Sequence, residues 1–442
     1  MTEPNKPAFF DVRMQGFRER ATVDAVLALL DARTRVLAVE VVPVLEAAGR
    51  VLAEPVVSAV DVPGFARSAM DGFAVRAEDT LSVLPLRIVG ESLPARPFMG
   101  EVTPGHAVRV TTGAPIPSGA DSVLMAEFAQ RDADGRVSAR APVVCGKHVV
   151  RVGEDVARGR EVLPAGRRLR PQDVGLLASV GAACVPVVRR PRVTILVTGN
   201  ELLPPGAMPE GFRIVDSNSP MLSALAARDG ADTLPVRYVR DDYDAVRDAI
   251  RDAAEGADVV LVSGGTSVGT EDHAPRAVAE LGELAVHGVA LRPAGPMGVG
   301  FLLKRSGEVV MGRMGDEEGN EALSPLHPFT PSPLLFLLPG NPVSCLCAYD
   351  LFAGRVVRRL GGRSWELPYA KVVLPIAEQI RSAVGRVDYV RVKREGNAVA
   401  PVASGGASNL SSTVAADGFV LVPHNRDALA PGELADVWLY DK

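Results

Sequence analysis

The sequence predicts a multidomain protein of α/β and β structure with a central doubly wound α/β domain. Between residues 192 and 362, apolar strand-like runs alternate with amphipathic helix-like runs, which is typical of parallel strands joined by crossover helices. Outside this region the runs are short, and the chain's 43 glycines and 35 prolines imply many turns, as in β-rich modules. A chain of 442 residues is also too long for one core, because domains usually hold roughly 100–200 residues.

The first expected element is a helix that starts at Thr22, where apolar residues recur at spacings of three and four in VDAVLALL. A second apolar helical stripe and a strand follow much later, in LRPQDVGLLASVGAACVPVV (169–188). Short β-type runs such as LPLRIVG and HAVRVTTG lie between them. We therefore predict a split N-terminal domain, residues 1–54 with 156–190, interrupted by a β-rich inserted module of residues 55–155.

The α/β domain is expected over residues 191–364. Its strands VTILVT, LPVRYV and DVVLV alternate with the helical runs SNSPMLSALAARDG and YDAVRDAIRDAAEG, which end at Gly230 and Gly256. Residues 365–442 return to short strands such as KVVLPIA and FVLVPH, and predict a small C-terminal β-barrel or a sandwich. The stretch 305–334 is rich in glycine, proline and acid. A loop this long is typical of a lid or of disorder, and we expect disorder.

Charge and composition disfavour several partners. The formal net charge of −5 gives no basic field of the kind that binds phosphate backbones, so we expect no nucleic-acid partner. No run approaches the ~18 apolar residues of a membrane span, and the chain starts without a signal-peptide pattern. Cys145, Cys184, Cys345 and Cys347 form no paired metal-binding motif and are expected to be reduced thiols, the last two in the core. We therefore expect a cytoplasmic protein.

Three polar strings follow predicted strands of the α/β domain: TGNE (198–201), SGGTSVG (263–269) and LPGNPVS (338–344). In open parallel sheets, ligands bind beyond the carboxyl ends of the strands. We therefore expect these three strings to lie around one ligand site.

The string SGGTSVG has the composition of a phosphate cradle. Gly264 and Gly265 can bring backbone N–H groups close to an anionic oxygen, and Thr266 and Ser267 add hydroxyl groups. A glycine-rich strand exit is also a common tight turn. This string alone therefore favours phosphate binding only slightly.

Two acidic residues near these strings are candidate metal ligands. A carboxylate beside a phosphate repels it unless a cation intervenes, and Mg²⁺ commonly bridges the two groups. Asp272 and Glu201 are the candidates for holding that ion. The alternative is that Asp272 caps the next helix and Glu201 is a solvated turn residue, and the residues alone favour that alternative. The motifs GxxxxGK[ST] and HExxH are absent from the sequence, which disfavours ordinary kinases and zinc proteases.

Longer strings point to one family. LEAAGRVLAEPVVSAVDVPGFARSAMDGFAV (45–75), VRVTTGAPIPSGADSVLMAE (108–127), VRVGED (150–155), LVTGNELL, VDSNSPML, VVLVSGGTSVGTEDH and LPGNPVS follow one another along the chain. In this order they resemble the molybdopterin molybdenumtransferase family, which includes bacterial MoeA and the E domain of gephyrin. The match spans roughly residues 20–435 and is far more specific than a single glycine-rich loop.

The resemblance implies a molybdopterin-binding-like α/β domain and an activity. Members of the family insert molybdate into adenylated molybdopterin and release AMP, with Mg²⁺ or a similar divalent ion. The resemblance implies a homodimer, and a molybdopterin adenylyltransferase is a candidate partner. It implies catalytic roles for Asp71, Asp155, Glu201 and Asp272, of which Glu201 and Asp272 are expected to hold the metal. The positions expected to bind substrate are Arg67, Ser68, Thr112, Arg151, Asn218, Ser263, Gly264, Gly265, Thr266, Ser267, Arg292, Pro339, Gly340, Asn341 and Pro342.

The chain departs from the family pattern in three places, one of which is the stretch 305–334. Where the family commonly reads KPGKP, this chain has RPAGP (292–296), so one lysine becomes Arg292 and the other becomes the uncharged Gly295. TGDE becomes TGNE, in which Asn200 keeps a hydrogen-bond acceptor. The lost cation motivates an alternative function, a catalytically weakened paralogue that acts as a molybdopterin-binding or scaffold protein. A nucleotide or phosphate hydrolase is a weaker third hypothesis.

Overall fold

The structure is a computed structural model that groups into two compact units. The α/β unit comprises residues 1–39 and 188–442, and the β-rich unit comprises residues 40–187. The residues that the structure describes are 17, 19–82, 84–267, 269, 272–303, 333–402 and 406–440.

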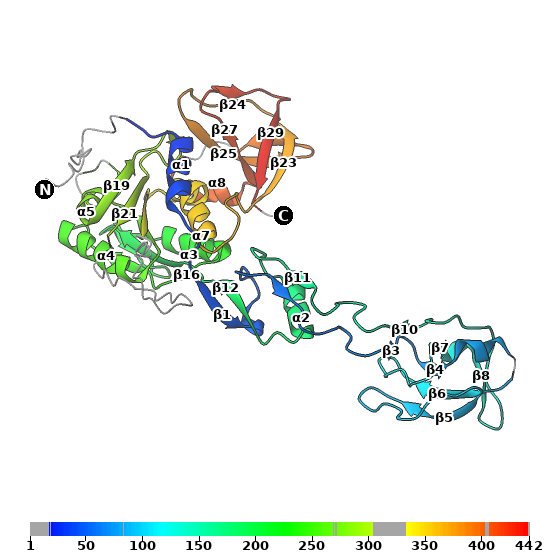
Figure 1. The fold of residues 1–442 in the computed structure, drawn as a ribbon. Helices are drawn as coiled ribbons and strands as arrows, with labels where there is room; N and C mark the ends of the chain where they lie inside the picture. The colour runs from blue at the N-terminus through cyan, green and yellow to red at the C-terminus, as the bar shows by residue number, and fades with distance from the viewer. Residues whose placement is uncertain are drawn as a thin grey trace, which may run out of the picture. The chain divides into compact units, whose positions relative to one another are not determined.

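A seven-stranded sheet forms the centre of the α/β unit (Figure 1). Its order is β16-β13-β18-β22-β21-β19, and β17 also pairs with β13. The strands β13, β16, β17, β18 and β22 pair in parallel, as predicted. The strands of the sheet are β13 Arg192–Thr198, β16 Asp232–Thr233, β17 Arg237–Val239, β18 Val259–Ser263, β19 Gly282–His287, β21 Gly298–Leu302 and β22 Leu334–Leu338. A separate short parallel pair is formed by β14 Leu202–Leu203 and β15 Ile214–Val215.

The sheet differs from the prediction at one edge, where β21 runs antiparallel to both β22 and β19. Only a short connection, without a helix, joins the end of β19 to the start of β21. A parallel pair needs a crossover of a dozen residues or more, whereas an antiparallel pair does not. The α/β sheet is therefore mixed.

Helices cover both faces of this sheet. Ile250 of α4 and Val278 of α5 share one buried cluster with Leu196, Val260 and Leu335 of the sheet. On the opposite face, α3 and α6 contact β13 and β22. The helices are α1 Val23–Arg33, α3 Asn218–Asp229, α4 Tyr243–Gly256, α5 Ala274–Leu281, α6 Pro342–Ala348 and α7 Gly354–Leu360, with the π-helical turn η4 Tyr349–Ala353 between the last two.

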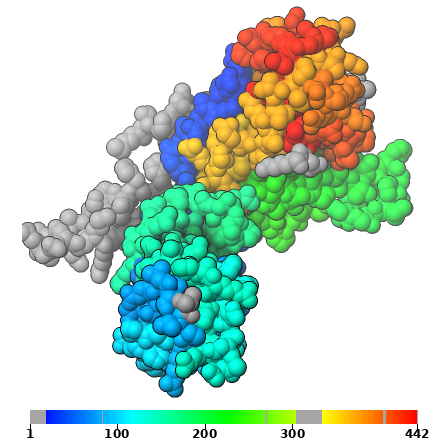
Figure 2. Space-filling view, turned by 90° about the vertical axis from the view of Figure 1, so that its right-hand side faces the viewer, coloured from blue at the N-terminus to red at the C-terminus, as the bar shows by residue number. Residues whose placement is uncertain are grey.

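Helix α1 belongs to the α/β unit and not to the split N-terminal domain in which it was expected. Thr22 caps it, because its hydroxyl oxygen accepts a hydrogen bond from the Ala25 N–H at 3.2 Å. Asp31 then pairs with Arg359 at 2.9 Å. Figures 1 and 2 show this blue segment against the yellow segment that contains α7. A helix-forming pattern does not indicate which body the helix packs on, so the predicted boundary at residue 54 differs from the observed grouping.

The C-terminal strands form an open six-stranded sheet of order β20-β25-β27-β29-β23, with β26 beside β25. In the described part of the chain no pairing joins β20 to β23, so the predicted closed barrel is not observed. One end of the sheet is occupied by the two-residue β20, which comes from the preceding α/β region and pairs in parallel with β25. The bounds are β20 Leu291–Arg292, β23 Ala370–Pro375, β25 Val387–Glu395, β26 Ala398–Pro401, β27 Gly418–Val422 and β29 Leu434–Leu439, with β24 Ile380–Arg381, β28 Ala428–Leu429 and α8 Leu410–Val414 outside the sheet.

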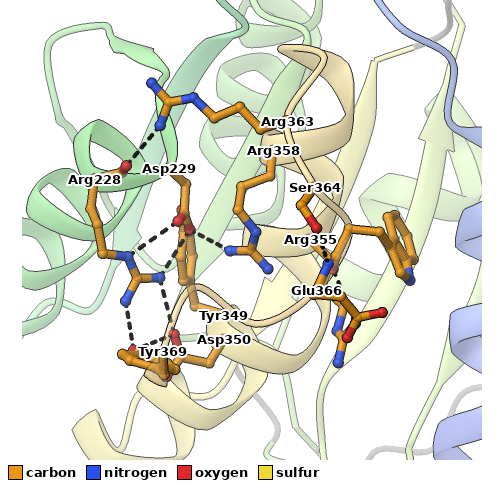
Figure 3. A network of polar contacts seen from close by, with 11 residues as sticks. Arg228, Asp229, Tyr349, Asp350, Arg355, Arg358, Arg363, Ser364, Glu366 and Tyr369 are labelled. Carbon is orange, nitrogen blue, oxygen red and sulfur yellow. Dashed lines mark hydrogen bonds and ion pairs between the residues drawn. The ribbon is translucent and has the colours of Figure 1, made fainter. Parts of the chain in front are cut away.

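A buried polar network ties α3 to α7 and to the start of the C-terminal sheet (Figure 3). The Asp229 carboxylate lies 3.0 Å from the guanidinium groups of both Arg228 and Arg358. Asp350 lies 3.2 Å from Arg228 and accepts hydrogen bonds from the Tyr369 hydroxyl at 2.9 Å. Burial raises the pKa of Asp350, while Arg228 opposes that rise. Two aspartates and two arginines therefore balance in charge.

The β-rich unit contains separate cores. In the first, Val42 and Leu52 pack with Leu163, Leu177 and Val187, so residues 42–52 and 163–187 share one core. Its elements are β1 Val39–Pro43, η1 Val44–Glu46, β2 Val56–Val57, β11 Glu161–Leu163, α2 Pro171–Ser179 and β12 Cys184–Val188. The other cores surround the sheet β5-β6-β4-β7. Here the elements are β3 Arg67–Ser68, β4 Gly72–Val75, η2 Ala77–Leu81, β5 Arg87–Ser92, β6 His106–Val110, β7 Ser122–Met125, η3 Ala126–Phe128, β8 Ala129–Arg131, β9 Val137–Ala139 and β10 Val149–Val150.

The substitution Asp173→Asn is expected to destabilise α2 by about 1.5–3 kcal/mol near neutral pH. The buried Asp173 carboxylate accepts hydrogen bonds from the side chains of Arg167 and Arg170, and these lower its pKa. The pKa of Asp173 in the folded state lies below its ordinary value. The stabilisation is therefore present above the ordinary value, and it is lost as the pH falls from there through the lower pKa of the folded state. Hydrogen exchange of the α2 amides should therefore differ most between wild type and variant near neutral pH. Exposed Asp134 offers a control, since Asp134→Asn should leave these amides unchanged.

The predicted disordered stretch 305–334 falls outside the described residues except for Pro333 and Leu334. Cys345 and Cys347 are buried in α6, as predicted. Within the described ranges, no helix has both the length and the apolar composition to cross a membrane.

Candidate functional site

A pocket of about 690 Å³ lies at the carboxyl ends of β13, β18 and β22 in the α/β unit. This is the edge at which ligands bind in parallel sheets, and all three predicted strings contribute to it. The predicted site residues that line it are Glu201, Asn218, Ser263, Gly264, Gly265, Thr266, Ser267, Asp272, Pro339, Gly340, Asn341 and Pro342.

The first two glycines of SGGTSVG are required by close packing on β13. Gly264 has φ +90°, and a Cβ atom there would lie 2.4 Å from the Thr198 carbonyl oxygen. At Gly265, with φ +60°, a Cβ atom would lie 2.7 Å from the Thr198 hydroxyl. Only glycine tolerates such a backbone at this distance. Contact with Thr198 therefore requires glycine at both of these positions of the cradle.

The cradle offers fewer free donors than predicted. The Gly264 N–H donates to the Leu338 carbonyl at 3.2 Å, and the Thr266 hydroxyl donates to the same oxygen at 3.3 Å. In the described part of the chain, the Gly265 N–H and the Ser267 hydroxyl make no hydrogen bond. Among the described groups of the cradle, these two are therefore free to bind an anion. Ser267 also fits a GxSxG pattern, but the structure gives its hydroxyl no bond to a described histidine or carboxylate.

Asn218 ties the loops of the pocket together. Its side-chain N–H groups donate to the Ser263 hydroxyl at 2.9 Å and to the Gly340 carbonyl at 2.7 Å. The Asp216 carboxylate in turn accepts hydrogen bonds from the N–H groups of Asn218 and Ser219, at 2.8 and 3.1 Å. Asp216 therefore caps α3 and holds Asn218 in place.

Among the described residues, three carboxylates besides the buried Asp216 line the pocket, those of Glu201, Asp241 and Asp272. The Asp272 carboxylate accepts a hydrogen bond from the Gly269 N–H at 2.5 Å and so closes the loop before α5 rather than capping that helix. The Asn200 N–H donates to the Asp241 carboxylate at 2.9 Å. Among the described residues, no group of three or more acidic, histidine or cysteine side chains is arranged to hold a metal ion.

The β-rich unit carries the other predicted acids. Asp71 lines a pocket of about 330 Å³ together with Arg109 and Arg131. The N–H and the hydroxyl of Thr112 both donate to its carboxylate, at 2.6 and 2.9 Å. Because these bonds favour the charged form, they hold the pKa of Asp71 below its ordinary value. The turn therefore presents a carboxylate that stays ionised.

The remaining predicted residues of this unit do not line the Asp71 pocket. The buried Ser68 hydroxyl donates to the Met70 carbonyl at 2.5 Å, so it shapes the turn. Arg67, Arg151 and Asp155 are exposed and do not line the Asp71 pocket. Their roles stay predictions.

Comparison with known proteins identifies the family. Residues 21–181 match the MoeA N-terminal region (domain I and II), residues 194–359 a "probable molybdopterin binding domain", and residues 373–440 the MoeA C-terminal region (domain IV). The molybdopterin molybdenumtransferase of Bacillus subtilis is 31% identical over 405 residues, which cover 86% of this chain and 84% of the relative. The chain belongs to the MoeA family.

Other members agree over most of their length. The molybdopterin molybdenumtransferase of Haemophilus influenzae is 30% identical over 384 residues, or 86% of this chain and 88% of that protein. The crystal structure of a MoeA protein of molybdopterin biosynthesis from Pyrococcus horikoshii has a TM-score of 0.77 at 30% identity and covers 96% of this chain and 100% of its own. The family assignment therefore rests on both sequence and fold.

Sequence reasoning missed several pocket residues of this MoeA family member. Asp216 stands in the quoted string VDSNSPML and could have been found as a helix cap. Asp241 lies two residues after the end of β17, where its position gave a weak signal. Pro296 and Ser408 come from the RPAGP turn and from a loop of the C-terminal region. Only the three-dimensional fold brings these two residues to the pocket.

Arg292 does not line the pocket at the carboxyl ends of the strands. It forms an ion pair with the buried Asp388 and lines a separate cavity of about 550 Å³ with Arg381 and Arg391. The RPAGP turn (292–296) therefore runs from that cavity, at Arg292, to the first pocket, at Pro296. Its substrate-binding role stays a prediction.

Proposed function

We propose that this chain inserts molybdate into adenylated molybdopterin and releases AMP. The observation that carries the proposal is that strings shared with the MoeA family converge on one pocket at the carboxyl ends of parallel strands. Its volume, about 690 Å³, suits a ligand of nucleotide size, because small-molecule sites usually measure ~300–1,000 Å³. Relatives of similar length carry the name molybdopterin molybdenumtransferase, which supports this substrate class.

The chain's own groups have distinct parts in this proposal. The Gly265 N–H and the Ser267 hydroxyl bind a phosphate oxygen of the adenylate. Asn218 orients the loops that carry Ser263 and Gly340, so that the bound phosphoanhydride is held in one position. The proposal includes a cytoplasmic homodimer that receives its substrate from a molybdopterin adenylyltransferase.

The donor set of the pocket suits a divalent cation. Glu201, Asp241 and Asp272 offer carboxylate oxygens, which are the ligands that Mg²⁺ prefers. Protein sites commonly bind Mg²⁺ through one or two carboxylates, with water and substrate phosphate as the other ligands. We propose that Glu201 and Asp272 hold Mg²⁺ in this way. When bound, the ion neutralises charge on the phosphoanhydride.

The purified chain, given adenylated molybdopterin and Mg²⁺, is expected to release AMP only when molybdate is added. Removing divalent cations with EDTA should lower AMP release by about 100-fold or more, and added Mg²⁺ should restore it, because the carboxylates of the pocket otherwise repel the substrate. AMP is quantified by liquid chromatography. Equal release without molybdate would instead indicate a simple hydrolase.

The alternative function, a catalytically weakened paralogue, is favoured by the RPAGP turn. Gly295 carries no charge, and the Arg292 guanidinium is paired with Asp388. Such a protein would bind adenylated molybdopterin as tightly as an active enzyme and yet release no AMP in the same assay. Measuring binding and AMP release on one preparation separates the two functions.

A further inference from the structure

The start of the described chain lies against the strand that leads into the RPAGP turn. The Ala21 N–H donates to the Gly288 carbonyl at 3.0 Å. The Phe17 ring meets the His287 ring edge-on, with 5.0 Å between centroids. A Cβ atom on Gly288 would lie only 2.6 Å from the Phe17 ring. Residues 17 and 19–21, the N-terminal segment, are therefore held at both ends.

Arg20 projects from this segment toward the RPAGP turn. Its Nη1 atom lies 3.8 Å from the position of a Cβ atom on Gly295. The side chain is exposed, and no described carboxylate forms an ion pair with it. The Phe17 ring, 5.8 Å away, is its aromatic neighbour. Among the described residues, no carboxylate therefore neutralises this guanidinium, which lies beside the point where a side chain of residue 295 would begin.

The pocket beside this turn is short of positive charge. Pro296 lines it directly after Gly295, together with the carboxylates of Glu201, Asp241 and Asp272. No lysine or arginine lines it among the residues that the structure describes. An anionic ligand would therefore meet repulsion from these carboxylates unless the proposed Mg²⁺ or a cationic side chain at the margin of the pocket offsets it.

We propose that Arg20 is the oxyanion-binding cation of the RPAGP turn and takes the place of a charged side chain at position 295. The ligand chemistry is a tetrahedral oxyanion, either molybdate or the phosphate of the adenylate. This inference rests on the proposed function, which supplies both anions as substrates. It also explains how position 295 tolerates glycine while the pocket retains a positive charge nearby.

The test is a double-mutant cycle on the full chain with molybdate and AMP as separate probes in equilibrium binding. Arg20→Ala is expected to raise the Kd of the bound anion about fivefold at low salt. Gly295→Lys should recover this loss in the Arg20→Ala background, since the nearest backbone atom to a Cβ there is 3.5 Å away. In wild type it should give a smaller gain, because two cations then repel each other. The probe whose Kd changes identifies the oxyanion.

Arg190→Ala is the matched control, because it removes one exposed positive charge before β13, away from the strand ends that form the pocket. It should leave both Kd values unchanged, and Arg20→Lys should keep most of the affinity. If wild type releases AMP but Arg20→Ala leaves the Kd values of both molybdate and AMP unchanged, the inference is wrong and the proposed function stands. If Arg20→Ala weakens binding but wild type never releases AMP, the proposed function is wrong and the inference stands.

Discussion

Replacing Asp272 with asparagine is expected to lower kcat/KM for molybdate-dependent AMP release by about 10²–10³-fold. The asparagine keeps an oxygen that can accept the Gly269 N–H, so the loop before α5 keeps its shape. What it loses is the negative charge that would hold the divalent cation next to the phosphoanhydride. The expected loss is therefore one of catalysis and not of folding.

The control for this variant is Asp244→Asn, which removes the same charge from an exposed position on α4. Its kcat/KM should match wild type. A second readout separates metal binding from other roles: the Mg²⁺ concentration for half-maximal AMP release should rise in Asp272→Asn and not in Asp244→Asn. Undiminished turnover in Asp272→Asn would refute the role assigned to this residue.

The pocket could be predicted where its chemistry is local in sequence. Strand ends followed by TGNE, SGGTSVG and LPGNPVS identify the ligand edge of a parallel sheet, and these strings do line the pocket. Which donors are free could not be predicted. The Gly264 N–H and the Thr266 hydroxyl both donate hydrogen bonds to the Leu338 carbonyl. These bonds form only because β18 and β22 are neighbours in the sheet.

Likewise, the sequence predicted the local elements of the fold but not how all of them are arranged. Alternating periods of apolar residues predicted the parallel strands and their helices. The antiparallel edge formed by β19 and β21 was missed, because strand direction depends on connection length and on neighbours rather than on composition. For the same reason, neither the unit that α1 packs on nor the open edge of the C-terminal sheet could be derived from periodicity.

The largest effect on stability is expected at the buried network of Figure 3, which no motif indicated. Asp229→Asn should lower the free energy of unfolding of the α/β unit by about 3–5 kcal/mol. The Asp229 carboxylate pairs with Arg228 and Arg358 and accepts a hydrogen bond from Tyr349 at 3.1 Å. Arg358 is buried, and Asp229 is the described carboxylate that it pairs with. Without that charge, a cation remains in a region of low dielectric constant.

Tryptophan fluorescence during urea unfolding measures this effect in the correct unit, because the chain's two tryptophans, Trp365 and Trp438, both belong to the α/β unit. Asp252→Asn, at an exposed ion pair on α4, should cost less than about 1 kcal/mol. Adding Arg358→Met to Asp229→Asn should recover part of the lost stability, since replacing a buried ion pair with apolar side chains removes the stranded charge. If the double variant were less stable than Asp229→Asn by the full cost of a second independent change, packing rather than charge balance would explain the network. Charge balance predicts the opposite sign, and the sign of that coupling decides between the two explanations.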